Sequence, residues 1–336
     1  MPNIYDVARE AGVSRSTVSR VINHQKSVIE SKRIRVLEAI EKLNYTPNAT
    51  ARALAMNKTN TIGVIARELT EDFYAGFINN IHRFADEHHY GILFCMRKTN
   101  SRYNIDYIDF LHKKVDGFIF LGENTVTEEE LRKLATAKTP VVVLEMNYPI
   151  QPITYINVNN EAAAYTSVMK LQNKHRCIAH ITASENTQEK EMRIRGFEKA
   201  IQDAGVLHGG IYHLPYYMVN ARLMIDAMID EFLEKGVSAA FCFNNAMATV
   251  LAEGLIKRKI KIPEEFAIIG FDDINYASQA ILPVPRISSN RQPQYEMAEY
   301  AITALVKSID ELHEEKEMKE DYSRVFSCEF VQGESS

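Results

Sequence analysis

Residues 4–23 read IYDVAREAGVSRSTVSRVIN and decide the fold of the amino-terminal part of the chain. Helical spacing relates the apolar residues of the first half, which are Ile4, Val7, Ala8 and Ala11. Gly12 is then a helix stop, and Ser14 can cap a second helix whose inward face is Val18, Val21 and Ile22. Two short helices separated only by Gly12-Val13 predict a helix-turn-helix, whose second helix can lie in the major groove of DNA.

A third helical segment follows at residues 31–45, SKRIRVLEAIEKLNY. Its predicted apolar stripe closes a miniature core and consists of Ile34, Leu37, Ile40 and Leu43. A core of about 45 residues is marginal by itself. We therefore expect its stability to depend on attachment to the rest of the chain or on DNA.

Charge is distributed unevenly along the chain. Residues 1–58 contain ten Lys or Arg and five Asp or Glu, a net charge of +5, whereas the whole chain carries −5. The remaining residues therefore carry −10. A small basic segment on a larger acidic one suggests that the basic segment meets a polyanion.

From Thr61 onward, short apolar runs alternate with stretches of helical spacing. The first series comprises TIGVIA, YGILFCM, VDGFIFLG, PVVVLEM and TYINVN, and the second CIAHIT, GIYHL, AAFCFN and FAIIGF. This alternation predicts parallel sheets built from right-handed crossovers. Two series predict two doubly wound lobes, with a ligand cleft between the carboxyl ends of their strands. The expected fold class is thus α/β, preceded by an all-α amino-terminal domain.

Composition and missing motifs exclude several classes of protein. No apolar run approaches the roughly 18 residues of a membrane helix, and the start carries Asp6 and Glu10 where an export signal would be apolar. We therefore expect a cytoplasmic, nucleoid-associated protein.

The four cysteines lie far apart, which favours buried thiols over disulfides or a zinc site. His82, Asp86 and His89 are better explained as a solvated helix face than as metal ligands. We expect no metal ion, no cofactor and no catalytic residues, because phosphate-binding loops and nucleophile motifs do not occur.

The same amino-terminal stretch, with residues 35–65, RVLEAIEKLNYTPNATARALAMNKTNTIGVI, resembles the start of the lactose-repressor (LacI/GalR) family of bacterial transcription regulators. The resemblance implies that Arg15, Ser16 and Arg20 reach base edges. It also implies that phosphates are held mainly by Ser14, Thr17, Ser19 and Asn23. Side-chain chemistry agrees, since arginine can contact guanine at two atoms and hydroxyls near a helix start suit phosphate oxygens.

Residues 48–60 contain too few apolar side chains to hold a helix in water alone. The resemblance implies a hinge helix that orders against its dimer mate on DNA, with Ala51 and Leu54 at the DNA. Leu54 matches a leucine wedge that enters the minor groove and bends the duplex. The alternative is a plain linker with Leu54 packed on the rest of the chain.

The remaining length also resembles this family, whose core is similar to a periplasmic sugar-binding protein with three crossings between two lobes. These crossings are expected near residues 160, 290 and 322. The resulting domains are a DNA-binding domain at 1–47, a hinge at 48–60 and a core at 61–336. The amino-terminal lobe would comprise 61–160 and 290–322, and the carboxyl-terminal lobe 161–289 and 323–336.

The resemblance also implies a set of ligand-binding side chains in the cleft. Arg193 and Asp272 match an arginine and an acid that hold effector oxygens and N–H or O–H groups, and Asn244 offers both a donor and an acceptor. Asp72, Phe73 and Tyr74 follow the first strand; Phe73 and Tyr74 could stack on a ring face of the ligand, with Asp72 beside them. Tyr216 or Tyr217 could form the opposite wall of the ligand site. The alternatives are a salt bridge between Arg193 and Asp272, and a core role for the aromatic rings. Departures from the family at Glu71-Asp72, Asn159-Asn160, Lys174, Asn245 and Gly333 prevent transfer of the ligand's identity.

The sequence therefore predicts a homodimeric repressor, or a higher oligomer of dimers, that binds near-palindromic operator DNA and responds to a small molecule, expected to be a sugar or sugar derivative. Whether the ligand releases DNA or promotes binding stays open. One alternative is a catabolite-control-type regulator whose partner protein docks on residues 292–309; there Tyr295 is compatible, but Thr303 replaces an arginine. Another alternative is a sugar-modifying enzyme with a basic accessory domain.

Overall fold

A computed structural model describes residues 2–22, 27–45, 58–67, 72–97, 107–111, 113–122, 125–148, 150–215, 218–276, 278–314 and 321–336, apart from the side chains of Asp72 and Tyr107. The chain divides into two compact units, Met1–Asn60, here called the head, and Thr61–Ser336, here called the body. No helix among the described residues is both long enough and apolar enough to cross a membrane.

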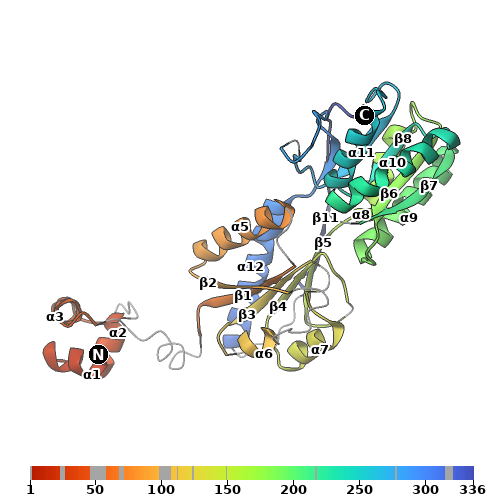
Figure 1. The fold of residues 1–336 in the computed structure, drawn as a ribbon. Helices are drawn as coiled ribbons and strands as arrows, with labels where there is room; N and C mark the ends of the chain where they lie inside the picture. Colours follow the sequence, from red (N-terminus) through yellow and green to blue (C-terminus); the bar gives the residue numbers. More distant parts are fainter. Residues whose placement is uncertain are drawn as a thin grey trace. The chain divides into compact units, whose positions relative to one another are not determined.

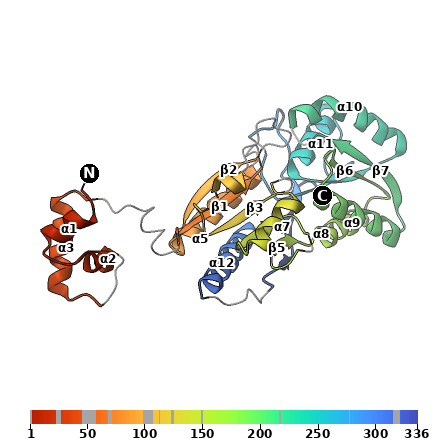
Figure 2. The same ribbon diagram turned by 90° about the horizontal axis from the view of Figure 1, so that it is seen from below.

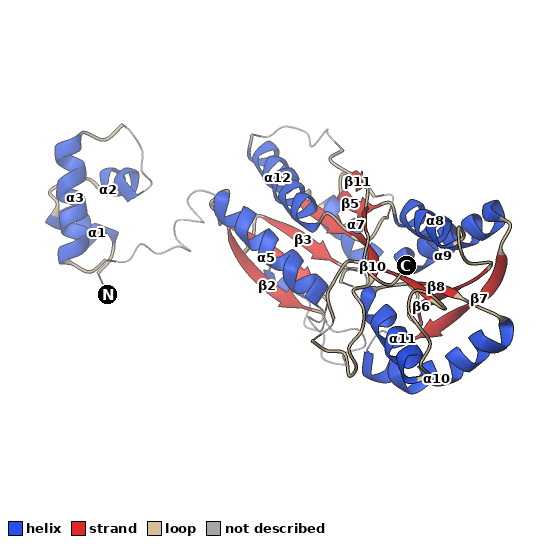
Figure 3. Cartoon of the chain, turned by 90° about the horizontal axis from the view of Figure 1, so that it is seen from above, coloured by secondary structure: helices blue, strands red, loops and turns tan. Residues whose placement is uncertain are grey.

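The described part of the head contains three packed helices, α1 (Ile4–Glu10), α2 (Arg15–Ile22) and α3 (Glu30–Lys42) (Figure 3). Asn3 and Asp6 form a capping box at the start of α1. Gly12 has φ of +62°, a left-handed conformation that costs glycine little. The buried side chains are Val7, Ala8, Ala11, Val18, Val21, Val36 and Ala39.

The predicted stripe of α3 is wrong at two positions. Ile34 and Leu37 are 48% and 51% exposed, whereas Val36 and Ala39 face the core, flanked by the partly buried Ile40 and Leu43. The segment IRVLEAI carries two overlapping apolar stripes of the same period. Which stripe faces inward depends on the packing of α3 against α1 and α2, which helical spacing alone does not determine.

The first lobe of the body is built on a six-stranded sheet in the order β11-β5-β4-β3-β1-β2, all parallel (Figure 1). Its strands are β1 (Thr61–Ala66), β2 (Gly91–Met96), β3 (Gly117–Leu121), β4 (Val141–Leu144), β5 (Thr154–Val158) and β11 (Arg324–Phe326). One face packs against α5 (Asp72–Glu87) and α12 (Gln294–His313). The other face packs against α6 (Tyr107–Leu111) and α7 (Glu128–Thr136).

The second lobe has a six-stranded sheet in the order β12-β10-β9-β8-β6-β7, in which only the β10–β12 pair is antiparallel. Its strands are β6 (Cys177–Ala183), β7 (Leu207–Leu214), β8 (Ala239–Cys242), β9 (Ala267–Phe271), β10 (Ser288–Arg291) and β12 (Glu329–Val331). Helices α8 (Asn160–Leu171) and α9 (Gln188–Ala204) cover one face, and α10 (Met218–Lys235) and α11 (Asn245–Lys257) cover the other (Figure 2).

The chain passes between the two sheets three times, after β5, after β10 and after β11. The third passage follows Phe326 rather than residue 322, because residues 324–326 add a parallel strand beside β5 in the first sheet. The second follows Arg291, since β10 pairs with β9. Residues 323–326 therefore lie with the first lobe, not with the second as predicted. The four cysteines are free thiols, of which Cys177 and Cys242 are buried and Cys95 and Cys328 are partly exposed.

Candidate DNA-binding surface and ligand cleft

Helix α2 presents a polar face to solvent because its apolar residues, Val18 and Val21, are buried against α1 and α3. Arg15, Ser16 and Arg20 are exposed on the opposite side. Ser14 accepts a hydrogen bond from the Thr17 backbone N–H at 3.2 Å, as an N-cap does. Its hydroxyl also lies 2.8 Å from that of Ser16. The expected base-reading and phosphate-holding side chains from Ser14 to Arg20 therefore lie along one helix, with Ser14, Arg15 and Ser16 at its start and Arg20 in its last turn.

Arg15 has a partner that the sequence did not reveal. Its Nη1 donates to the Tyr5 hydroxyl at 3.1 Å, and its guanidinium carbon lies 5.7 Å from the centre of the Tyr5 ring. Tyr5 is itself exposed on α1. The contact orients Arg15 on the outer face of the head and adds Tyr5 to the surface that DNA would meet. Asn23, Ala51 and Leu54, also expected at DNA, lie outside the described residues.

In the body, Arg193 is the buried centre of the candidate ligand site. It is 2% exposed on α9, and its guanidinium carbon lies 3.6 Å from the centre of the Phe271 ring. Its Nε donates to Asn160 Oδ1 at 2.9 Å, and its Nη1 donates to the Phe243 carbonyl oxygen at 2.5 Å. These contacts come from the starts of α8 and α9 and the ends of β8 and β9. Arg193 on α9 therefore contacts the start of α8 and the ends of β8 and β9.

Asp272 follows β9 and adopts a φ of +82°, which is uncommon for a residue with a side chain. Its Oδ1 lies 4.0 Å from Arg193 Nη2 and accepts a hydrogen bond from Gln292 Nε2 at 2.8 Å. Burial raises the pKa of Asp272, while the Arg193 charge and the Gln292 hydrogen bond oppose the rise. The arginine and the acid predicted from the sequence are thus adjacent, and Gln292 joins them from the second crossing between lobes.

Two further acids, Glu145 and Glu189, meet this group. Glu145 directly follows β4 in the first lobe, and Glu189 lies one turn before Arg193 on α9 of the second. Burial, then the charges of Glu189 and Asp272, raises the pKa of Glu145, while Arg193 and a hydrogen bond with Tyr74 lower it. Burial also raises the pKa of Glu189, with Arg193 and Arg67 opposing. Acidic groups of both lobes therefore interact electrostatically with one another around Arg193.

The sequence did not identify Glu145 and Glu189 as site residues. The position of Glu145 carried a usable signal, because ligands of doubly wound sheets bind at the carboxyl ends of strands and Glu145 is the first residue after VVVL. Glu189 carried none, since its proximity depends on how α9 packs. The structure thus brings together Arg193, Asp272 and Tyr74 of the predicted set and adds Glu145, Glu189 and Gln292.

The other predicted ligand residues have structural partners. Phe73 is 4% exposed and lies with Phe77 in the core of the first lobe, so its ring faces other core side chains. Asn244 caps α11, with its Oδ1 accepting from the Met247 N–H at 2.9 Å. The side chain of Asp72 and the residues Tyr216 and Tyr217 lie outside the described part of the chain.

One side chain links the lobes beside the acids. Gln188 Oε1 accepts from the Asn147 N–H at 3.0 Å, and Gln188 Nε2 donates to the Asn147 carbonyl oxygen at 3.1 Å. Gln188 precedes Glu189 on α9, and Asn147 lies two residues after Glu145. This pair of hydrogen bonds fixes the two acid-bearing segments relative to each other.

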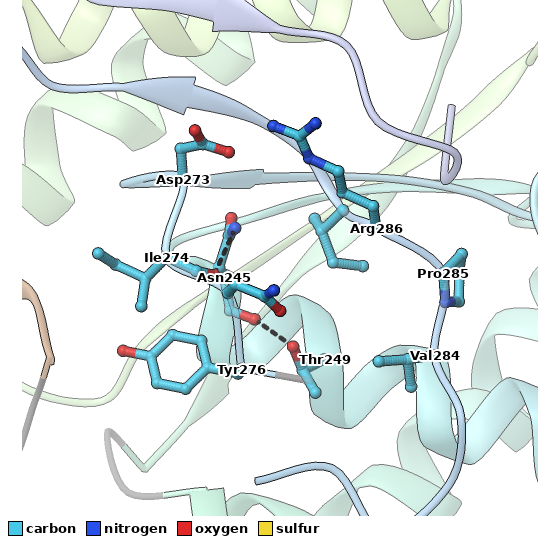
Figure 4. A pocket seen from close by; sticks show the side chains of 10 residues that line it. Asn245, Thr249, Asp273, Ile274, Tyr276, Val284, Pro285 and Arg286 are labelled. Atoms are coloured by element: carbon cyan, nitrogen blue, oxygen red, sulfur yellow. Dashed lines mark hydrogen bonds between the residues drawn. The ribbon is translucent and has the colours of Figure 1, made fainter. Parts of the chain in front are cut away.

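A pocket of about 480 Å³ lies in the second lobe, and its lining includes Asp273, the residue after Asp272 (Figure 4). It is lined by Asn245, Thr249, residues 273–276 and residues 284–287. Asn245 Nδ2 donates to the Ile274 carbonyl oxygen at 3.0 Å, and its Oδ1 accepts from Ser289 at 2.8 Å. Asn245 thereby holds the loop after β9 that carries Asp272. Arg193, Asn244 and Asp272 do not line this pocket.

Comparisons with known proteins agree with this two-part arrangement. Residues 3–48 match the model "Bacterial regulatory proteins, lacI family", and residues 169–336 match "Periplasmic binding protein-like domain". Catabolite control protein A of Priestia megaterium is 32% identical over 309 residues, which cover 90% of this chain and 91% of that protein.

Two solved structures are similar in fold. A lac repressor dimer bound to operator and the anti-inducer ONPF has a TM-score of 0.82 at 20% identity, covering 99% of this chain and 98% of that one. A complex of the transcriptional regulator CelR with cellobiose has a TM-score of 0.69 at 24% identity, covering all of both chains.

Proposed function

We propose that the chain, which belongs to the LacI family of DNA-binding transcriptional regulators, is a repressor of carbohydrate-related genes. A small molecule in the cleft would control its affinity for operator DNA. The observation that carries this proposal is the cluster of Arg193, Asp272, Gln292 and Tyr74 at the facing strand ends. Convergent polar groups at that edge are the usual ligand site of such folds.

The operator would be read by the exposed face of α2. In this proposal Arg15, Ser16 and Arg20 would contact base edges, and Ser14, Thr17 and Ser19 would contact phosphates. Asn23, Ala51, Leu54 and the hinge at 48–60 belong to the same proposal. A twofold protein presents two such helices, so the site would be near-palindromic.

Exposed apolar side chains of the body support a second copy of the chain as partner. Leu93, Phe94 and Met96 are exposed on β2, the edge strand of the first sheet. Val219, Leu223 and Met224 are exposed on α10 in the second lobe. An exposed apolar edge strand can pair with, or be covered by, another chain, and a dimer interface would remove it from water. The solved lac repressor bound to operator is a dimer.

The cleft suits a ligand with vicinal hydroxyl groups, because it presents carboxylates, an amide and a phenol at short range. CelR, which shares the fold, was solved with cellobiose. We expect binding without turnover. Product formation from a bound sugar by the purified chain would contradict this part of the proposal.

A partner protein in place of the small molecule is less well supported. The helix that would bind an anionic partner is α12, whose only basic side chains are Lys307 and His313. Thr303 lies between two acids, at positions 296 and 299, and Lys307. Tyr295 on this helix packs edge-on against Phe84, with Arg83 5.6 Å from its ring centre. Arg83 thus adds positive charge beside the two basic side chains of α12, and Thr303 in place of an arginine is what disfavours this partner.

The function is tested by two measurements on the full chain. Footprinting on fragments from a random duplex library should reveal a symmetric protected site, and binding should weaken steeply with salt as phosphate contacts are replaced by counterions. Thermal-shift screening against sugars, sugar phosphates and nucleobases should find a compound that raises the midpoint by mass action. A strictly monomeric chain with no preferred DNA sequence would contradict the proposal.

A further inference from the structure

The cleft contains more acid than base among its described side chains. Three carboxyl groups meet there, those of Glu145, Glu189 and Asp272. The opposing charges are those of Arg193, which acts on all three acids, and Arg67, which acts on Glu189. With all five groups ionised the site has a net negative charge. Arg193 lies beside Asp272 and Arg67 acts on Glu189, so these two described arginines leave Glu145 without a separate arginine partner.

Arg193 is poorly placed to neutralise Glu145 through hydrogen bonds. Its Nε and Nη1 already donate to Asn160 and to the Phe243 carbonyl oxygen, and its Nη2 faces Asp272. Tyr74 supplies one hydrogen bond to the Glu145 carboxyl group. Among the described residues the remaining oxygen, Oε2, has no hydrogen-bond partner, although Glu145 is only 9% exposed. A buried carboxyl oxygen without a donor is unfavourable, so the site favours a ligand that brings one.

Gln292 provides an independent indication of the same kind. It is 5% exposed, its Nε2 donates to Asp272, and its Oε1 accepts no hydrogen bond within the part of the chain that the structure describes. Both unsatisfied atoms, Glu145 Oε2 and Gln292 Oε1, are therefore oxygens that can accept a hydrogen bond. A ligand must supply donors here, and a phosphate or carboxylate would meet repulsion from three acids instead.

We infer that the cleft takes a sugar-like ligand bearing a protonated amine, which Glu145 binds as its anionic partner while Asp272 and Gln292 bind its hydroxyl groups. This inference rests on the proposed function. A neutral hydroxyl could donate to Glu145, but only a cation also balances the charge, and charge-assisted hydrogen bonds are the stronger kind. Burial raises the pKa of Glu145 in the empty site and a bound ammonium group would lower it, so binding of the amine should release protons from Glu145 to solvent.

The test compares matched ligands on the full chain. D-glucosamine, D-galactosamine and D-mannosamine are each measured against the parent hexose and its 6-phosphate, by thermal shift and then by titration calorimetry. At least one amine should bind about tenfold or more tightly than its parent. Its heat of binding should vary with the ionisation enthalpy of the buffer, showing proton release. The inference would be overturned if every parent hexose or its 6-phosphate bound as tightly as the matching amine or more tightly. It would also be overturned if none of the three amines bound.

A variant assigns the effect to one residue. Glu145→Gln keeps the shape and removes the charge, so the preference for the amine over the hydroxyl partner should be lost. Glu198→Gln, the same change on the exposed face of α9, is the matched control and should keep the preference. A preference retained by the Glu145 variant would overturn the inference. Should that variant not fold, the buffer dependence of the unsubstituted chain decides alone. An amine that binds but leaves operator affinity unchanged contradicts the proposed function and not this inference.

Discussion

The head and the cleft hold their charged side chains in opposite ways. In the head, Arg15 and Arg20 are exposed on one helix whose buried face is made by other residues. In the cleft, Arg193 is almost fully buried and bound by Asn160, Phe243, Phe271 and Asp272, which come from separate strands and helices. Substitution of Arg15 or Arg20 in the head should therefore change DNA affinity with little change in stability. Substitution in the cleft should change both ligand binding and stability.

The largest effect is expected for Arg193→Ala. Removing the guanidinium leaves the Asn160 and Phe243 oxygens without their donor and the buried Asp272 carboxylate without its opposing charge. Loss of one member of a buried charged pair typically costs about 3–5 kcal/mol of unfolding free energy. Urea denaturation followed by circular dichroism measures it. Arg195→Ala, on the exposed face of the same helix and paired with Glu161 at 3.2 Å, should cost less than about 1 kcal/mol. Equal losses in the two variants would remove the contrast between buried and exposed arginines.

The next effect is expected in the head, for Arg20→Ala. Losing a two-atom contact to a guanine should weaken operator binding by about 1–3 kcal/mol, or roughly 5- to 150-fold. Because Arg20 is exposed, unfolding should change by no more than about 0.5 kcal/mol. Fluorescence anisotropy on operator and on random duplex separates loss of specificity from general loss of phosphate contacts. A variant that unfolds more easily yet keeps its specificity would show that Arg20 is structural.

A smaller effect with a definite sign is expected for Glu145→Gln. Burial and neighbouring acids raise the pKa of Glu145 above its ordinary value of 4.5, so the folded state retains a proton that the unfolded state releases as pH rises. This acid therefore lowers stability above its ordinary pKa and has no effect below it. The variant should be more stable than the unsubstituted chain at neutral pH, and the gain should vanish as pH falls below about 4.5. Thermal unfolding across this pH range checks both points, and a loss of stability at neutral pH would contradict the assigned sign.

The smallest effect is expected for Glu10→Gln in the head. Lys42 Nζ lies 2.6 Å from Glu10 Oε1, and the lysine side chain is largely exposed. Exposed pairs contribute about 0.2–1 kcal/mol and are screened by salt. The loss should therefore disappear in high-salt buffer. A larger, salt-independent loss would mean that the head depends on this pair more than its exposure allows.

Sequence patterns predicted the local features of the head and the sheets better than the composition of the cleft. Apolar runs located β1 to β9, because buried parallel strands need continuous apolar stretches. The short strands β10, β11 and β12 are too polar or too brief to give that signal. The family resemblance gave Arg193 and Asp272, but Glu145, Glu189 and Gln292 reach them through packing between segments distant in sequence. Helical periodicity likewise left open which of two stripes α3 would bury.

In the proposed mechanism, occupancy of the cleft governs the affinity of the head for DNA. The most direct measurement is the affinity of the full chain for its selected operator, by anisotropy, with and without a saturating compound found by thermal shift. A coupling of about 1–3 kcal/mol predicts a 5- to 150-fold change, and operator must alter the compound's affinity by the same factor. Operator affinity that stays the same at saturation would contradict the claim.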